Sequence, residues 1–522
     1  MHIADEFGET SSKGEVNHIS EKRNKFTRNI VCLAAGLWVV LSIIVMIAAD
    51  PMIGIVVLAL PLVLWLFKAI LFYIHGVMVS PLISPSHTMT LPLVGVKTDT
   101  PTCVYAAIFL LSFIAGSGAR SWPRGSSANL FCVLFYNTFG AWVMVLVAVY
   151  AVDVVFRIGE AAGRKPGKKN KALAAWTMSV IFLIQSAILS YSTPTVTRMV
   201  LPVRNLEPCL SGYKICLLSD VHVGPLVSKS DSTRALGVCK DEGIDAIALV
   251  GDLGDEKYVE GGWIDENLQP YKDFRAEVAG VEVLWTSGNH ENIVGIEGWR
   301  EAAAKFGIRN VENDHFVHFV ERVDGCVGNV SFVGIADEGG ERMRNQGTYG
   351  SGIALPDISG TMTGLRNSSG ADGLGGPVVL LSHTPRNFQK NVDSGVDVML
   401  SGHTHGGHVF PFHFFMFSFD GASGLFETKR KEAGGVGRGW MYVSDGVVGW
   451  GPRVRLFSRP EIAIIELTTD NDEFDREPEG DTGLRVGQFF SWFSYAAVPL
   501  ACLSCLIVNI RQWRGEKEGK KG

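Results

Sequence analysis

Cysteine is scarce in this sequence, with nine among 522 residues. Five cysteines lie in or beside long apolar runs, where cysteine usually behaves as a small apolar side chain: Cys32, Cys103, Cys132, Cys502 and Cys505. The other four lie in a long polar stretch: Cys209, Cys216, Cys239 and Cys326. A disulfide such as Cys209 to Cys239 is compatible with an oxidising compartment, but the chain has little cysteine framework beyond that.

The chain also lacks the mark of a cleaved signal peptide. Its first apolar run, 30–49, is about 20 residues long, enough to cross a bilayer, and no small-residue cleavage pattern follows it. Comparable runs occupy residues 52–74, 103–117, 129–155, 173–191 and 488–510. We therefore expect a multi-pass membrane protein, with a membrane region of about five spans over residues 30–192 and a C-terminal transmembrane span at 488–510.

Ionisable side chains are almost absent from these runs. Lys68 and Asp153 are the visible candidates, and both positions are compatible with span ends. Because pathways for ions and polar solutes through a membrane usually carry ionisable residues, this scarcity argues against a transporter.

Positively charged residues predict the orientation of the spans, since Lys and Arg that flank spans tend to remain in the cytoplasm. They gather in the N-terminal segment 1–29, the loop 157–171 and the tail 511–521, which six spans would place on one side. The polar stretch 193–487 then faces the extracytoplasmic side, luminal or extracellular. Only residues 50–51 separate the first two runs, so a re-entrant hairpin there is the alternative, and it would reverse the orientation.

Short apolar runs that end in polar residues recur through the polar stretch. They read YKICLLSD at 213–220, DAIALVGD at 245–252, VEVLWTSGNH at 281–290, PVVLLSH at 377–383 and VDVMLSGHTH at 396–405. Runs of this kind are typical of strands buried on both faces, and the amphipathic segments 228–242 and 297–306 suit covering helices. We expect a layered α/β unit. Residues 339–377, rich in Gly, Ser, Thr and Asn, are predicted to form a flexible surface insertion.

The polar residues at these strand ends favour a metal site. In sheets with parallel strands, ligands collect where the strands end and the loops begin. Five successive runs finish in Asp, Asn or His, and none of these ends offers a thiolate. Oxygen and imidazole ligands favour Mn, Fe or Zn over a cysteine-zinc site, and they disfavour Ca, which prefers oxygen ligands alone.

The same residues resemble the motifs of the calcineurin-like metallophosphoesterases, in order and approximate spacing. The motifs are SDVHVG at 219–224, VGDLGD at 250–255, SGNHE at 287–291, LLSHTP at 380–385 and SGHTHGG at 401–407. The closing stretch after residue 441 is similar to a membrane-anchored branch of that superfamily. The resemblance covers about residues 210–467, and it implies a layered β-sandwich flanked by helices.

Two divalent or transition metal ions are implied by the resemblance. One would be held by Asp220, His222, Asp252 and His405. The other would be held by Asp252, Asn289, His383 and His403, with Asp252 bridging the pair. His290 matches the proton-handling histidine of the family. Such a pair activates a shared hydroxide for attack on a phosphomonoester or phosphodiester.

Several neighbouring residues keep more than one interpretation. Asp255 stands where a related branch has a metal-binding tyrosine, so it is expected to hold its loop. Glu291 either orients His290 or caps a helix, and His408 is expected at the rim. Two interpretations remain for a further set of residues: contact with a phosphate or its leaving group, or an ordinary surface salt bridge. These residues are Arg386, Trp450, Arg453 and Arg455.

The sequence therefore predicts a phosphoester hydrolase with its catalytic domain outside the cytoplasm. Since six spans exceed what anchoring requires, a lipid-linked phosphoester is the preferred substrate class. The alternative is a catalytically inactive membrane sensor or transporter that uses the phosphoesterase fold for ligand binding. With a formal net charge of −6, no nucleic-acid partner is expected.

Overall fold

The computed structural model describes residues 77–78, 88–90, 97–99, 126–163, 167–339, 353–368, 375–409, 420–432 and 435–469. The predicted N-terminal segment 1–29 and the apolar runs 30–49, 52–74, 103–117 and 488–510 lie outside these residues. The chain divides into two compact units, Met1–Tyr105 and Ala106–Gly522. In the first unit, the short strands β1 (Thr88–Thr90) and β2 (Lys97–Asp99) pair antiparallel.

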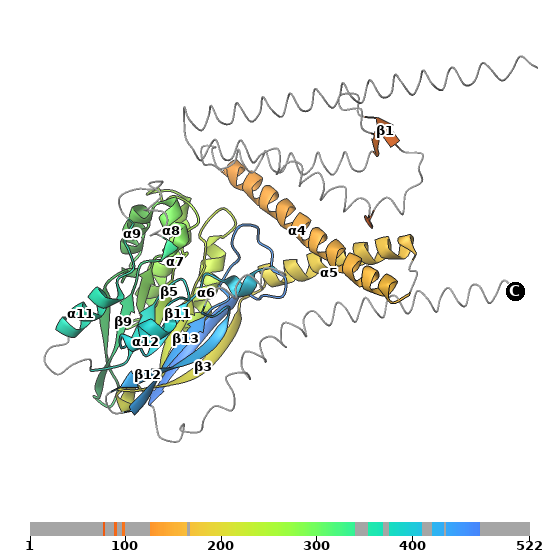
Figure 1. Ribbon diagram of the computed structural model, residues 1–522. Helices are drawn as coiled ribbons and strands as arrows, with labels where there is room; N and C mark the ends of the chain where they lie inside the picture. Colours follow the sequence, from red (N-terminus) through yellow and green to blue (C-terminus); the bar gives the residue numbers. More distant parts are fainter. Residues whose placement is uncertain are drawn as a thin grey trace, which may run out of the picture. The chain divides into compact units, whose positions relative to one another are not determined.

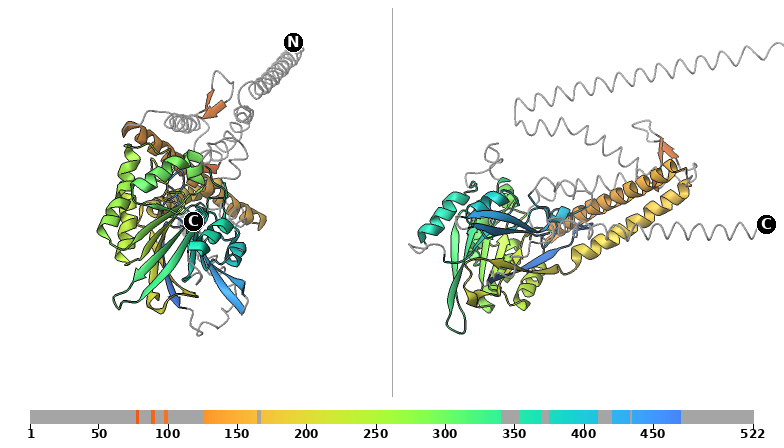
Figure 2. Two further views of the ribbon diagram at one scale, coloured as in Figure 1. Left: turned by 90° about the vertical axis from the view of Figure 1, so that its left-hand side faces the viewer. Right: turned by 60° about the horizontal axis from the view of Figure 1, so that its bottom comes forward.

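The second unit begins with two long apolar helices, α4 (Ser126–Ala161) and α5 (Lys168–Tyr191). They lie side by side, as the right-hand view of Figure 2 shows. Within the described part of the chain, Tyr136–Ala161 and Lys168–Tyr191 are the two helical segments long and apolar enough to cross a membrane. They correspond to the apolar runs predicted at 129–155 and 173–191.

The polar part of the chain forms two six-stranded sheets (Figure 1). The first sheet has, in spatial order, β3 (Thr195–Val203), β14 (Glu461–Thr469), β4 (Tyr213–Leu218), β5 (Ala246–Val250), β6 (Glu282–Thr286) and β7 (Arg309–Asn310). The second has β12 (Gly424–Glu432), β13 (Gly435–Val443), β11 (Val398–Ser401), β10 (Val378–Leu381), β9 (Val327–Gly334) and β8 (His315–Glu321). Strands β4, β5 and β6 run parallel, as do β9, β10, β11 and β13.

The alternation of side chains along β4 explains the layers. Ile215 and Leu217 join a core shared by both sheets, whereas Cys216 and Leu218 join a second core on the opposite face. That second core lies under the helices α6 (Lys229–Asp241), α7 (Trp263–Glu277) and α9 (Ile296–Lys305). A third core lies between the second sheet and the helices α11 (Ile358–Ser368) and α12 (Phe388–Asp393). The unit is a β-sandwich flanked by helices, as the sequence predicted.

One helix corrects the prediction of a flexible insertion over residues 339–377. Within the described part of that stretch, α11 buries Ile358, Met362 and Leu365 in the third core. The apolar residues are few, but their spacing of three and four residues puts them on one face of a helix. Low overall hydrophobicity therefore concealed a packed element.

The cysteine pairing also differs from the example chosen in the sequence. Cys209 bonds to Cys326, and Cys216 bonds to Cys239. Cys239, on α6, belongs to the core under the helices, whereas Cys209 packs against the core between the sheets. Because the first sheet separates these two cores, a Cys209 to Cys239 bond is sterically excluded.

Candidate metal centre

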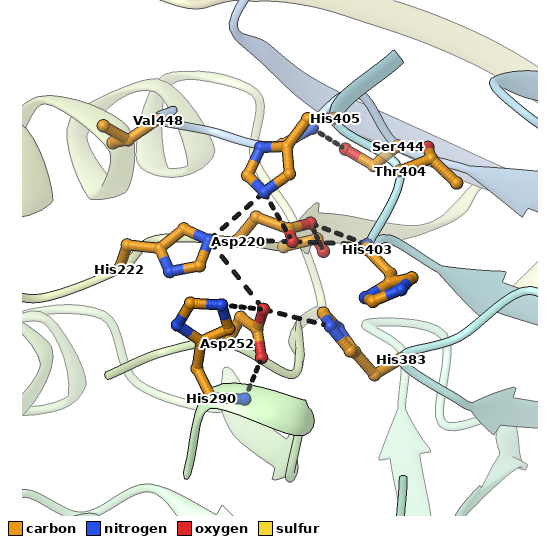
Figure 3. A network of polar contacts seen from close by, with 12 residues as sticks. Asp220, His222, Asp252, His290, His383, His403, Thr404, His405, Ser444 and Val448 are labelled. Atoms are coloured by element: carbon orange, nitrogen blue, oxygen red, sulfur yellow. Dashed lines mark hydrogen bonds and ion pairs between the residues drawn. The ribbon is translucent and has the colours of Figure 1, made fainter. Parts of the chain in front are cut away.

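The five predicted strand ends converge on one edge of the sandwich (Figure 3). Asp220 follows β4, Asp252 follows β5, and Asn289 begins the short helix α8 (Asn289–Val294) after β6. The second sheet contributes His383 after β10, and His403 and His405 after β11. All seven predicted metal ligands, with His222 between the first two strands, thus meet at this edge. Parallel strands bring them together, since their carboxyl ends lie at the same side of the sheet.

One half of the cluster centres on Asp220. Its Oδ1 atom lies 3.3 Å from His405 Nε2 and 3.9 Å from His222 Nε2, and the two ring nitrogens lie 3.2 Å apart. The backbone N–H of His403 donates to the same carboxylate at 3.1 Å. All three donor side chains are at least nine-tenths buried. Three donor atoms therefore point at one small space.

The other half centres on Asp252. Its Oδ2 atom lies 3.2 Å from His383 Nε2, 3.8 Å from His222 Nε2 and 3.9 Å from His290 Nε2. His383 Nε2 also lies 3.2 Å from Asn289 Oδ1, and its Nδ1 lies 2.9 Å from the carbonyl oxygen of Val250. Because a carbonyl only accepts, Nδ1 carries a proton, and Nε2 is the ring nitrogen that faces the carboxylate and the amide oxygen.

The donor set fits a pair of cations. Three groups of residues each bring one possible ligand atom within 4.8 Å of the others: Asp220 with His222 and His405, His222 with Asp252 and His290, and Asp252 with His383 and His403. Burial and the neighbouring His222 lower the pKa of His405 well below its usual value, so its ring stays neutral and can bind a metal. Positive charge between these groups would lower the repulsion among the facing ring nitrogens and the cost of burying the carboxylates.

The backbone at the site is held in an uncommon conformation. Five of the predicted ligands have positive φ angles: Asp220 (56°), His222 (51°), Asp252 (49°), His403 (70°) and His405 (50°). Each such residue costs on the order of 1–3 kcal/mol and persists when its surroundings enforce it. Two glycines in the motifs make room for this packing. A Cβ at Gly288 would lie 2.1 Å from Asp252 Oδ1, and one at Gly402 would lie 1.6 Å from Ser219 Oγ.

Glu291, a carboxylate outside the ligand set, organises the loops. Glu291 is fully buried and accepts the backbone N–H groups of Gly288 and Gly254 at 2.7 Å and of Asp252 at 3.1 Å. Of the two roles considered for Glu291, the capping role is therefore the one observed. Its carboxylate also fixes the loop that carries Asp252, which the sequence did not indicate.

Asp255 lies beside His290, with Oδ1 2.6 Å from His290 Nδ1. Burial lowers the pKa of His290, but the carboxylates of Asp252 and Asp255 outweigh it and raise the pKa to about 9. The expectation that Asp255 holds its own loop missed this contact. Only the fold reveals it, because 35 residues separate the two side chains.

The hypothesis of phosphate contact fails for two of the arginines. Arg455 is 1% exposed and donates to the carbonyl oxygens of Asp445 at 2.7 Å and of His405 at 3.4 Å, among others. Arg453 donates to Asp231 at 2.7 Å. A buried guanidinium needs several acceptors, and here the loops themselves supply them. Arg386 stays a prediction.

Two further residues lie at the edge of the cluster. The ring of His408 stands edge-on to that of His405, with centroids 5.4 Å apart. Trp450 is 53% exposed, and its ring centroid lies 5.9 Å from that of His290. Trp450 is thus an exposed aromatic side chain beside the predicted proton donor.

The chain is similar to several known proteins. Residues 213–407 match the family model for calcineurin-like phosphoesterases. A transmembrane protein with metallophosphoesterase domain from Danio rerio is 26% identical over 348 residues, which are 64% of this chain and 73% of that protein. The Bos taurus protein of the same name is 24% identical over 65% of this chain and 74% of its own length. An uncharacterized metallophosphoesterase from Campylobacter jejuni is 26% identical over 56% of this chain and 69% of its own.

All seven predicted ligands, from Asp220 to His405, lie within the matched residues. Both halves of the cluster therefore belong to the matched domain. Residues 213–407 match the calcineurin-like phosphoesterase domain, and the chain around them is similar to proteins of the membrane-anchored branch of that family.

Proposed function

We propose that this chain is a dinuclear metal-dependent hydrolase of phosphomonoesters or phosphodiesters, with its catalytic domain on the extracytoplasmic side of a membrane. The observation that carries the proposal is the position of Asp252. Its carboxylate belongs to two of the three possible ligand groups, one with His222 and one with His383. A carboxylate shared between two groups is what a cation pair requires.

The residues that would hold the cations are those of the two halves. Asp220, His222, Asp252 and His405 would hold one, and Asp252, Asn289, His383 and His403 would hold the other. Mn, Fe and Zn suit this set of oxygen and nitrogen donors. When bound, such a pair lowers the pKa of water and neutralises charge on phosphoryl oxygens.

His290 is the residue assigned to proton transfer. In hydrolysis, the oxygen of water forms a bond to phosphorus, the bond between phosphorus and the leaving oxygen breaks, and the leaving oxygen takes up a proton. A protonated His290 supplies that proton, and water returns one to the ring. Asp255 fixes the orientation of the ring through Nδ1, which leaves Nε2 to face the reacting group.

The orientation rests on the charge pattern of the sequence and on the cysteines. All four cysteines of the domain are paired in disulfides, which persist in oxidising compartments. The rival function, an inactive membrane sensor, would not need a complete set of ligands.

The test compares the full-length protein in lipid nanodiscs with its Asp252→Asn variant. Bound metal is measured by mass spectrometry, and hydrolysis is measured with 4-nitrophenyl phosphate and bis(4-nitrophenyl) phosphate in the presence of Mn²⁺. We expect bound metal and turnover in the wild type, and a loss of turnover of at least about 100-fold in the variant. Asp273→Asn, on the exposed side of α7, is the matched control. A wild type without metal and without hydrolysis would establish the sensor instead.

A further inference from the structure

One segment after β13 joins the candidate metal centre to helix α5. We call residues 453–457 the docking strip. The guanidinium of Arg453 donates to the carbonyl oxygen of Ser190 at 3.0 Å, and the backbone N–H of Arg455 donates to Ser186 Oγ at 3.2 Å. The ring of Phe457 stands edge-on to that of Phe182, with centroids 5.9 Å apart. The strip therefore follows one face of α5.

The spacing of these contacts has a simple geometric cause. Contacts on α5 recur every four residues, at 182, 186 and 190, and an advance of four residues along a helix is about 6 Å. Contacts on the strip recur every two residues in the opposite direction, and two extended residues advance about 6.6 Å. The two repeats match, so the strip runs antiparallel along the last turns of the helix.

The opposite side of the strip contacts the loop that carries the histidine ligands. The backbone N–H of Leu456 donates to the carbonyl oxygen of His408 at 3.0 Å, and Arg455 donates to that of His405. Helix α4 closes on the same segment, because a Cβ at Gly140 would lie 2.4 Å from Val454 Cγ1 and 3.0 Å from Pro452 Cβ. The ligand loop thus rests on both apolar helices through one layer of backbone.

The connection between the membrane helix and the catalytic domain is short. Helix α5 ends at Tyr191 and β3 begins at Thr195. A simple tether needs no such contact, and a flexible linker of any length would serve it. The polar region of each bilayer leaflet is only about 5–8 Å deep. A site attached directly to the end of a span therefore lies at the depth of lipid phosphates.

The side chains at this end of α5 suit a membrane surface. An apolar stripe of exposed residues runs along the helix: Leu173, Trp176, Val180, Ile184, Ile188 and Tyr191. The stripe ends at Tyr191, which is 52% exposed, and the guanidinium of Arg453 lies 4.6 Å from the centre of its ring. Tyrosine and tryptophan are frequent at the boundary between lipid and water. Trp450, in the same loop, is a further exposed aromatic side chain, and its ring contacts that of His290.

We infer that the substrate of the proposed hydrolase is a membrane amphiphile, whose phosphoester enters the centre from the bilayer surface at the Tyr191 end of α5. Trp450 is the positioning residue that packs on the group next to the ester. The inference rests on the proposed function. The reaction is the same hydrolysis, with the acyl chains left in the bilayer.

The experiment uses the full-length protein with Mn²⁺ in phosphatidylcholine nanodiscs and two pairs of substrates. Dioleoyl phosphatidic acid is compared with glycerol 3-phosphate, and dioleoyl phosphatidylglycerol with glycerophosphoglycerol. For at least one pair, kcat/KM of the lipid exceeds that of its water-soluble headgroup by tenfold or more. Trp450→Ala lowers this ratio by about tenfold, because an aromatic contact contributes about 1–1.5 kcal/mol. Phe319→Ala, an exposed aromatic residue on β8, leaves the ratio unchanged.

A second pair of variants tests the strip without touching the centre. Gly140→Ala presses on Val454 and lowers the ratio, whereas Gly159→Ala, in the same helix with nothing within 4 Å, does not. A wild type that hydrolyses the headgroups or the chromogenic esters as well as the lipids overturns the inference and leaves the proposed function standing. A ratio that neither Trp450→Ala nor Gly140→Ala changes also overturns it. A metal-free protein that hydrolyses no ester overturns the proposed function, and the inference with it.

Discussion

His290 and Asp255 form a short contact at the candidate metal centre, with Nδ1 and Oδ1 2.6 Å apart. His290 belongs to one possible ligand group, with His222 and Asp252, whereas Asp255 belongs to none of the three groups. Because a ring nitrogen that is held by a carboxylate fixes the direction of the other nitrogen, Asp255 controls where His290 points. The same Oδ1 atom lies 3.8 Å from Nδ1 of His222, so Asp255 faces one predicted metal ligand as well as His290.

Asp255→Asn should slow turnover while metal content is kept. The amide can still contact Nδ1 but does not stabilise a protonated ring, so we expect kcat to fall by about 10–100-fold. Metal content by mass spectrometry and turnover of bis(4-nitrophenyl) phosphate are measured on the same sample. Loss of metal in this variant would instead show that Asp255 supports metal binding, directly or through His222.

Arg455→Met should destabilise the domain far more than removal of a surface arginine. The guanidinium of Arg455 is buried and donates to carbonyl oxygens in two connections, that between β11 and β12 and that between β13 and β14, and these oxygens would be left without a donor. We expect a loss of about 3–5 kcal/mol. Arg198→Met is the comparison, since Arg198 is an exposed residue paired with Glu242, and exposed pairs of this kind contribute little to stability. Equal melting temperatures for the two variants would refute the structural role of Arg455.

Removal of the disulfides should lower stability without removing the ligands. The bonds close loops of 117 residues, between Cys209 and Cys326, and of 23 residues, between Cys216 and Cys239. Loops of these lengths correspond to roughly 3–5 kcal/mol of stabilisation through the unfolded chain. Thermal melts with and without reductant measure the effect. Replacing both partners of one bond with serine should lower the melting temperature and leave a smaller response to reductant, and an unchanged response would contradict the pairing.

His318 should make the stability of the domain sensitive to mild acid. Its side chain is buried, its Nδ1 atom lies 2.7 Å from the hydroxyl of Tyr213, and burial lowers the pKa of His318 below the usual 6.5. The unfolded chain therefore takes up a proton first as pH falls through about 6.5, so stability is present above that pH and decreases below it, until the pKa of the folded state is reached.

The check on this linkage is the change in melting temperature between pH 7.5 and pH 5.5. In His318→Gln, which retains a polar side chain but does not titrate, that change should be smaller than in the wild type. An identical change in the two proteins would assign the acid sensitivity to other groups.

The strands that carry ligands were predictable because each is short, apolar and buried on both faces. Along β4, neighbouring side chains enter different cores, so every residue is apolar and the run stands out in the sequence. The edge strands β8 and β12 were missed, since partly exposed strands mix polar and apolar residues. Helix α11 was missed for a related reason, because its buried residues are few.

The sequence by itself determined the donor types and their order, since Asp, Asn and His at strand ends suffice to indicate a metal site. Only the tertiary structure decided which of the surrounding charges serve that site. Arg455, Glu291 and Asp255 looked alike as charged residues near motifs, yet one binds carbonyls, one caps a helix and one holds His290. Their partners lie across loops and sheets. A contact of that kind depends on how the strands are paired and packed, which local sequence patterns do not record.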